Sequence, residues 1–187
     1  MTTLADLGPR IVIMGPSNSG KSTLAVAIWR ARGLAPVHLD QLHHQPGTDW
    51  APRPASEFRA LHDTALIEDR WVMDGNYTRF LPQRLVRATG MLLLDVPVTV
   101  SLWRYIRRCR FEPHRVGGLG AGRERVKWDM IHHIAVVTPR NRRRYDALAD
   151  TSALPTIKLT SRNAIDAFYR DERLDLAGVS SGIAVDR

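Results

Sequence analysis

Residues 15–23, with the sequence GPSNSGKST, constrain the fold of this chain more than any other feature. They match the pattern G-x-x-x-x-G-K-[ST], in which glycines let the backbone curl until successive N–H groups converge on phosphate oxygens. The apolar run 11–14 before the loop predicts a buried strand, and residues 24–29 after it predict a helix. A glycine-rich turn that arose by chance would not need a strand before it and a helix after it. We therefore expect a strand, a phosphate-binding loop and a helix whose positive end faces the phosphates.

The residue types in this loop indicate a nucleoside triphosphate. The residues expected to contact the phosphates of ATP are Gly15, Ser17, Asn18, Ser19, Gly20, Lys21, Ser22 and Thr23. The ammonium group of Lys21 reaches the β- and γ-phosphates, and the hydroxyl of Ser22 is a ligand for Mg²⁺. No Thr/Asn-Lys-x-Asp motif that reads guanine is present, which favours ATP over GTP. The predicted cofactors are ATP and Mg²⁺.

Length and composition are those of one globular domain. The chain has 187 residues, of which 44% are hydrophobic and 25% charged. No apolar run approaches the roughly 20 residues that cross a bilayer, and residues 1–6 do not resemble a signal peptide. The single cysteine, Cys109, excludes an internal disulfide. We expect a cytoplasmic protein without a membrane partner, either a monomer or a homodimer.

Positive charge is concentrated in one block. Residues 104–144 contain twelve Lys and Arg against three Asp and Glu, while the whole chain has a net charge of +8. Such a block binds nucleic acid or surrounds a polyphosphate. Few aromatic residues interrupt it, so we expect nucleic acid to be the less favoured partner. The glycine-rich residues 117–122 predict a flexible joint within the block.

Apolar runs alternate with helical segments along the chain, which is typical of an α/β protein with a parallel sheet. The predicted strands are residues 11–14, 37–39, 71–73, 91–95 and 156–159. The predicted helices are residues 21–31, 55–69, 79–88, 98–110, 123–136, 140–149 and 162–174. The fold class we predict is an α/β three-layer sandwich with a five-stranded parallel sheet.

Two carboxylates follow predicted strands, where ligands of open parallel sheets bind. Asp74, before Gly75, is expected to hold Mg²⁺ through its waters together with Ser22. Asp40 is expected to face the γ-phosphate, where a carboxylate accepts a proton from an attacking hydroxyl or holds it in line. The alternative for each is a side chain that caps a turn.

A pair of arginines is the remaining candidate for catalysis. Arg104 and Arg108 are four residues apart and share one helix face. Arginines beside a transferring phosphoryl group neutralise the charge that develops on it. The histidine pairs 43–44 and 132–133 lack a Cys, Asp or Glu cluster to complete a metal site, so we expect surface or packing roles. We expect packing roles for Trp50, Trp103 and Trp128, and the alternative is that they line a pocket for the nucleotide base.

Taken in order, these motifs resemble the adenylate-kinase-like P-loop kinases. They are closer still to the small bacterial branch often labelled "DNA topology modulation protein" or adenylate kinase-related. The resemblance covers about residues 10–170, and it rests on the phosphate loop, Leu39-Asp40, Pro46-Gly47, residues 71–77, Asp95-Val96-Pro97 and Arg104-x-x-x-Arg108. It implies one kinase domain over residues 1–187, with an acceptor-binding insert at about 40–70 and a helical lid at about 110–140.

The resemblance also implies roles for individual residues. Arg104 and Arg108 contact the base and its phosphates, and Ser161 and Arg162 lie where the family touches adenine. Arg142 is among the lid arginines that close over the transferring phosphate. The expected acceptor-binding residues are Asp40, Gly75, Asn76, Tyr77, Arg79 and Arg84.

The chain departs from the family after its second predicted strand. Adenylate kinases carry a Gly-Asp-x-x-Arg element there that grips an acceptor phosphate, whereas this chain has Asp40-Gln41-Leu42-His43-His44. A carboxylate in this place is similar to kinases that phosphorylate a hydroxyl. Our leading hypothesis is an ATP- and Mg²⁺-dependent phosphotransferase acting on a nucleotide, nucleoside or similar small molecule. A kinase of a sugar-type hydroxyl and a nucleotide-dependent nucleic-acid-binding ATPase stay open as alternatives.

Overall fold

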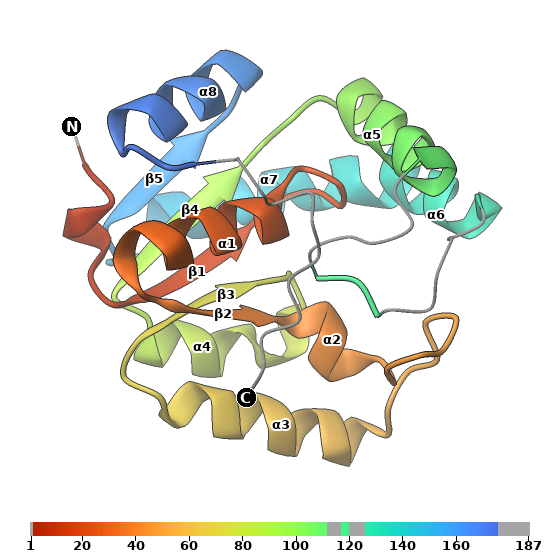
Figure 1. Cartoon of the computed structure of the whole chain (residues 1–187), viewed down its shortest axis with the longest axis horizontal. Helices are drawn as coiled ribbons and strands as arrows, with labels where there is room; N and C mark the ends of the chain where they lie inside the picture. Colours follow the sequence, from red (N-terminus) through yellow and green to blue (C-terminus); the bar gives the residue numbers. More distant parts are fainter. Residues whose placement is uncertain (1, 112–116, 120–125, 176–187) are drawn as a thin grey trace.

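A five-stranded sheet forms the centre of the molecule (Figure 1). The computed structural model describes residues 2–111, 117–119 and 126–175. The strands are β1 (Arg10–Met14), β2 (Ala35–His38), β3 (Trp71–Asp74), β4 (Gly90–Leu94) and β5 (Thr156–Leu159). They lie in the order β2-β3-β1-β4-β5, and all four pairings are parallel. The predicted five-stranded parallel sheet is confirmed.

Helices connect the strands and cover both faces of the sheet. The α-helices are α1 (Lys21–Arg32), α2 (Leu39–His43), α3 (Ala55–Ile67), α4 (Leu81–Arg87), α5 (Val98–Phe111), α6 (Trp128–His132), α7 (Thr138–Thr151) and α8 (Arg162–Asp171). Two 3₁₀ turns, η1 (Ala5–Leu7) and η2 (Thr78–Phe80), and a π-helical turn, η3 (His133–Val137), complete the elements. No helix in the described part of the chain is long and apolar enough to cross a membrane.

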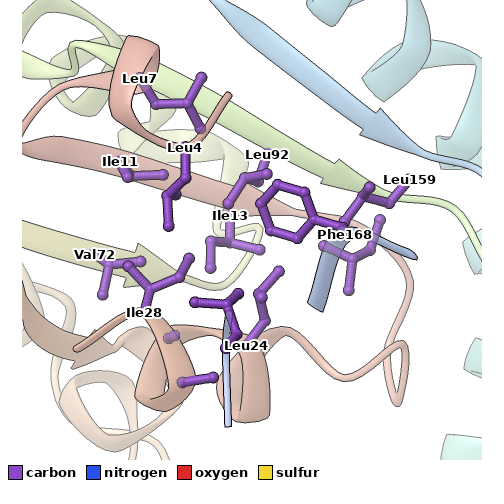
Figure 2. Packing of buried hydrophobic residues seen from close by; sticks show 14 of the residues in the cluster. Leu4, Leu7, Ile11, Ile13, Leu24, Ile28, Val72, Leu92, Leu159 and Phe168 are labelled. Atoms are coloured by element: carbon purple, nitrogen blue, oxygen red, sulfur yellow. The ribbon is translucent and has the colours of Figure 1, made fainter. Parts of the chain in front are cut away.

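The alternation of side chains along β1 divides the core into two layers. Ile11 and Ile13 point to the face covered by α1 and α8, where they pack with Leu24, Ile28 and Phe168 (Figure 2). The neighbouring residues Val12 and Met14 point to the opposite face and pack against α3, α4 and α7. The three-layer sandwich predicted from the sequence is therefore confirmed.

The structure corrects two element boundaries. Residue 39 was predicted to end a strand, but β2 ends at His38 and Leu39 begins the short helix α2, so Asp40 lies in a helical first turn. Helices predicted at 123–136 and 140–149 form one continuous run from α6 through η3 to α7. Pro139 lies directly after the π turn η3, where the regular bonding pattern of the α-helix is already interrupted. Much of the predicted lid at 110–140, namely 112–116 and 120–125, lies outside the described residues.

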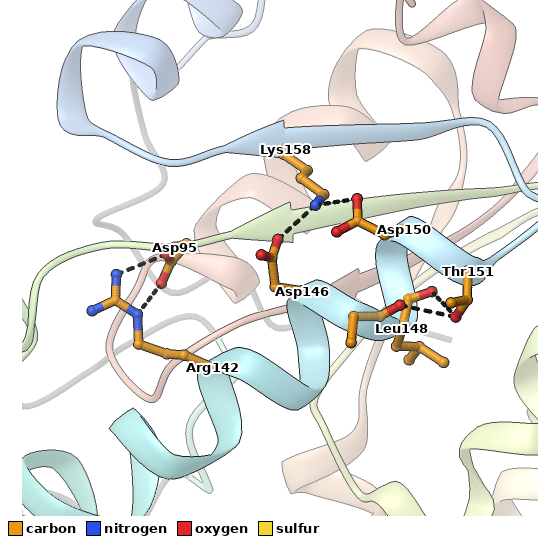
Figure 3. Close-up of polar contacts among 8 residues, drawn as sticks. Asp95, Arg142, Asp146, Leu148, Asp150, Thr151 and Lys158 are labelled. Carbon is orange, nitrogen blue, oxygen red and sulfur yellow. Dashed lines mark hydrogen bonds and ion pairs between the residues drawn. The ribbon is translucent and has the colours of Figure 1, made fainter.

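The long α6–η3–α7 run contacts the rest of the protein at two places. Ile134 of η3 packs with Tyr105 and Cys109 of α5. Figure 3 shows α7 tied to the sheet, with Arg142 paired to Asp95 after β4 and Lys158 of β5 bonded to two carboxylates of α7. These contacts fix the helix across the edge of the sheet where the strands end.

Candidate active site

A cavity of about 1150 Å³ opens beyond the carboxyl ends of the strands. Its walls come from the phosphate loop, the start of α1, α2 with the loop that follows, the turn after β3, one face of α5, the α6–η3–α7 run and the first turns of α8. Parallel strands bring their following loops to one edge, so residues far apart in sequence meet here. The sequence-predicted residues that line the cavity are Ser17, Asn18, Ser19, Gly20, Lys21, Ser22, Thr23, Asp40, Asp74, Gly75, Asn76, Tyr77, Arg104, Arg108 and Arg162.

The phosphate loop has the curled backbone that its sequence predicts. Gly15 has φ +142°, and a Cβ there would lie 2.2 Å from the carbonyl oxygen of Leu94, so only glycine fits. The ammonium group of Lys21 donates to the carbonyl oxygens of Gly15 (3.0 Å) and Pro16 (2.6 Å). Lys21 therefore lies folded over the mouth of the loop, within reach of a phosphate bound there.

Asp74 is the buried centre of a hydrogen-bond network beside Lys21. The hydroxyl of Ser22 donates to its Oδ2 at 2.6 Å, and Nδ1 of His38 is paired with its Oδ1. Burial raises the pKa of Asp74, but the charge and hydrogen bond of His38, the hydroxyl of Ser22 and the charge of Lys21 outweigh it and hold this pKa below its usual value. The group is thus a carboxylate at neutral pH.

Ser22 and Asp74 offer the hard oxygen atoms that Mg²⁺ prefers. No cluster of three or more His, Cys, Asp or Glu side chains that could hold a metal ion occurs among the described residues. The backbone at Gly117 lies against this corner, because a Cβ on that glycine would be 3.0 Å from Oγ of Ser22. The donor set fits magnesium held with a triphosphate.

Helix α5 brings its two predicted arginines to the phosphate loop. Arg104 donates to the carbonyl oxygen of Ser19 at 2.8 Å, and Arg108 is bonded to Oδ1 of Asn18. Burial, followed by the nearby charges of Arg162 and Arg107, lowers the pKa of Arg104. These neighbouring positive charges repel one another, and negatively charged phosphates that enter the cavity would stabilise them.

Asp40, at the start of α2, lines the same cavity as the α5 arginines. The phenol of Tyr77 donates to its Oδ1 at 2.7 Å. Burial and the charge of Asp40 raise the pKa of Tyr77 above its ordinary range, so the phenol stays protonated. Within the described residues, Oδ2 of Asp40 has no hydrogen-bond partner. This oxygen is open toward the cavity and can accept a proton.

The turn after β3 is tied to the phosphate loop. The side-chain amide of Asn76 accepts from the N–H of Gly15 (3.2 Å) and donates to its carbonyl oxygen (2.9 Å). Asn76 therefore holds two walls of the cavity together, a positioning role that its sequence context did not indicate.

Arg84 was expected to hold the acceptor, but the structure does not bring it to the cavity. It is fully buried and donates to the carbonyl oxygens of Gly75 (2.7 Å), Asn76 (2.6 Å) and Tyr77 (3.1 Å). Burial lowers the pKa of Arg84 to about 10, which leaves it protonated at neutral pH. Its donors serve the backbone of the turn, so we assign it a structural role.

Three other expected site residues also lie outside the cavity lining. Arg142 forms a bidentate pair with Asp95 at 2.7 and 2.5 Å and anchors α7 (Figure 3). Arg79 is exposed and lies over the ring of Phe80. Ser161 caps α8 by accepting from the N–H of Ala164 at 3.1 Å. Of the three, Arg142 lies near the phosphate loop, because it lines a small pocket together with Gly15 and Pro16.

The sequence analysis missed several residues that line or support the cavity. His38 supports Asp74, and the exposed residue His133, for which a surface or packing role was expected, also lines the cavity. Burial, followed by the charges of Lys21 and His132, lowers the pKa of His133. Trp50 and Trp103, for which the sequence offered a pocket role as an alternative to packing, also line the cavity. The one sign of a role for His38 in the sequence was its position, one residue before the predicted end of a strand.

Comparison with known proteins identifies structures that share the fold of this chain. No protein-family model matches the chain, and no curated protein is significantly similar in sequence. The chain is similar to the structure of a shikimate kinase from Acinetobacter baumannii in complex with shikimate, with a TM-score of 0.56 and 16% identity over 89% of this chain and 92% of that one.

Two further structures superpose less well. A gluconokinase from Sinorhizobium meliloti (89% of this chain, 95% of that one) and a sugar kinase from Janibacter sp. (92% and 98%) each match with a TM-score of 0.46 and 16% identity. The comparison therefore rests on the shikimate kinase structure. At this identity the likeness concerns the fold alone: the chain has the α/β fold of a P-loop kinase.

Proposed function

We propose that this protein is an ATP- and Mg²⁺-dependent phosphotransferase that moves the γ-phosphoryl group to a small-molecule acceptor. The observation that carries the proposal is that one cavity contains both the phosphate loop with Lys21 and a carboxylate, Asp40, whose Oδ2 is open. A site that only bound a nucleotide would not require a proton acceptor in the same cavity.

The charge distribution supports phosphate handling over nucleic-acid binding. Four residues of the basic block line the cavity: Arg104, Arg107, Arg108 and Lys127. Arg142 of the same block is neutralised by Asp95. The block therefore supplies the charge that a triphosphate needs within an enclosed site.

In the proposed reaction, ATP supplies the phosphoryl group and Mg²⁺ neutralises charge on its phosphates. Lys21, Arg104 and Arg108 stabilise the charge that develops on the transferring group. Asp40 accepts the proton of the acceptor hydroxyl at Oδ2 as the hydroxyl oxygen bonds to the γ-phosphorus and the bond to the oxygen of ADP breaks. Tyr77 holds the carboxylate in place through Oδ1.

The Asp40→Asn variant tests this proposal. Asparagine keeps the acceptor atom for the Tyr77 phenol but removes the proton acceptor, so we expect kcat for hydroxyl acceptors to fall about 10²-fold. The measurement is ADP release from Mg·ATP with a panel of nucleosides, sugars and nucleoside monophosphates. The KM for ATP should change little, because in this proposal the phosphate loop and not Asp40 binds the phosphates of ATP.

Two outcomes would contradict the proposal. A slow ATP turnover that no acceptor accelerates would indicate an ATPase. An unchanged kcat in Asp40→Asn would remove Asp40 from proton transfer.

A further inference from the structure

The acceptor end of the cavity is built from aromatic rings. Asp40, His44, Trp50 and Tyr77 line it. The His44 and Trp50 rings meet edge to face with centroids 5.1 Å apart, and His43 packs against Tyr77 at 4.8 Å. A wall of this composition offers flat apolar surface beside a single carboxylate.

Backbone strain is concentrated on this cavity. In the described part of the chain, four residues other than glycine have positive φ: Asn18 (62°), Trp50 (64°), Tyr77 (22°) and Arg173 (53°). The first three line the cavity, and Arg173 does not. A bulky aromatic residue in this conformation is unfavourable and persists only where its surroundings impose it, which is a feature of functional sites.

The loop around Trp50 is built to hold the indole in that conformation. The N–H of Gln45 donates to the carbonyl oxygen of Ala51 at 2.9 Å, and Thr48 bonds to both residues through its hydroxyl. His44 and Pro52 form a β-bridge at the base of the loop. Trp50 is thus held by a closed loop and directed into the cavity.

The described groups at this end carry no net positive charge. Asp40 is a carboxylate, and burial followed by the charge of His44 lowers the pKa of His43, so that residue is neutral at pH 7. Both ring nitrogens of His44 are bonded, one to His43 (3.2 Å) and one to the carbonyl oxygen of Asp40 (2.9 Å). The nearby ammonium group of Lys127 is paired with Asp49 at 2.7 Å. A phosphate or carboxylate on the acceptor would meet the charge of Asp40, and the ammonium group of Lys127 in the same cavity is already paired with Asp49.

We propose that the acceptor is an uncharged cyclic alcohol whose ring packs against the indole of Trp50 and whose reacting hydroxyl is bonded to Asp40. This inference rests on the proposed function and names the substrate class of the same site. Nucleosides and neutral cyclic sugars or polyols share this chemistry. Trp50 is then a residue that determines specificity.

The test compares uncharged acceptors with their anionic counterparts. Phosphoryl transfer from Mg·ATP is measured with nucleosides against nucleoside monophosphates, and with neutral cyclic sugars against sugar acids. We expect one uncharged class to have a kcat/KM at least about tenfold higher than its anionic counterpart. A preference for the anionic counterparts in both pairs would overturn the inference.

Trp50→Gly and Arg173→Gly form a matched pair of variants. Each relieves a positive φ, so neither is expected to lower the melting temperature. Only Trp50→Gly should raise the KM for the acceptor, by about tenfold or more, because only it removes the ring. Trp50→Phe should restore most of the affinity. An acceptor KM that is unchanged in Trp50→Gly, or equally raised in Arg173→Gly, would overturn the role of Trp50.

Calorimetry separates this inference from the proposed function. The same uncharged acceptors are titrated into wild type and Trp50→Gly in the presence of Mg²⁺ and a non-hydrolysable ATP analogue. Binding that Trp50→Gly loses, without any phosphoryl transfer by wild type, would support the inference and contradict the proposed function. Absence of binding and of transfer for every uncharged acceptor would overturn the inference.

Discussion

Lys21→Ala is expected to lower kcat for phosphoryl transfer by a factor of about 10³, with a smaller effect on the affinity for ATP. The ammonium group lies over the mouth of the phosphate loop, bonded to the carbonyl oxygens of Gly15 and Pro16. From there it reaches the oxygen atoms on which charge accumulates as the phosphoryl group is transferred. Steady-state kinetics with saturating acceptor measures the change.

Lys158→Ala is the control for the loss of a lysine. Lys158 is bonded to Asp146 and Asp150 of α7 at 2.6 Å, away from the cavity (Figure 3). Its removal should leave kcat within about twofold, because surface ion pairs contribute at most about 1 kcal/mol. Equal activity of Lys21→Ala and Lys158→Ala would show that the phosphate loop does not take part in the reaction.

Arg84→Ala is expected to lower the free energy of unfolding by about 3–5 kcal/mol. The guanidinium group is fully buried, and its loss leaves a void and deprives the carbonyl oxygens of Gly75, Asn76 and Tyr77 of their donor. Those residues form the turn that carries the acceptor wall of the cavity. Urea unfolding followed by circular dichroism measures the change.

Arg79→Ala is the matched control, since Arg79 lies five residues before Arg84 and is exposed. We expect a change within about 0.5 kcal/mol. A variant of Arg84 that is as stable as wild type but has a raised KM for the acceptor would instead support the substrate contact that the family resemblance implies for this position.

Much of the fold is predictable from periodicity and from one motif. The apolar runs of β1, β3 and β4 are buried on both faces, so they appear in the sequence as short continuous stretches. The phosphate loop fixes the strand and the helix on either side of it. Because the strands are parallel, the loop and the residues after β2 and β3 had to meet at one edge.

Other parts of the site depend on contacts that a local pattern does not contain. Arg84 has the same residue type as the solvated arginines around it, and only the folded turn makes it a buried donor. The backbone conformation of Trp50 depends on the bonds that close its loop between His44 and Pro52. The family resemblance supplied roles for Arg142 and Ser161, whereas their contacts in the structure, an ion pair with Asp95 and the cap on α8, depend on the fold.

The π-helical turn η3 can be considered as one extra residue in an otherwise regular helix. The residues of the α6–η3–α7 run that face the cavity include Met130, His133, Thr138, Asn141 and Tyr145. A plain α-helix repeats a face every three or four positions, and the step of five from His133 to Thr138 is the one that the π turn accommodates. Deleting one residue between them would leave a step of four, which a regular α-helix accommodates without turning its face. Asn141 and Tyr145 would then stay on the cavity side, and Arg142 would keep Asp95. The π turn therefore lets this segment carry one residue more than a plain helix needs while the cavity wall keeps its place.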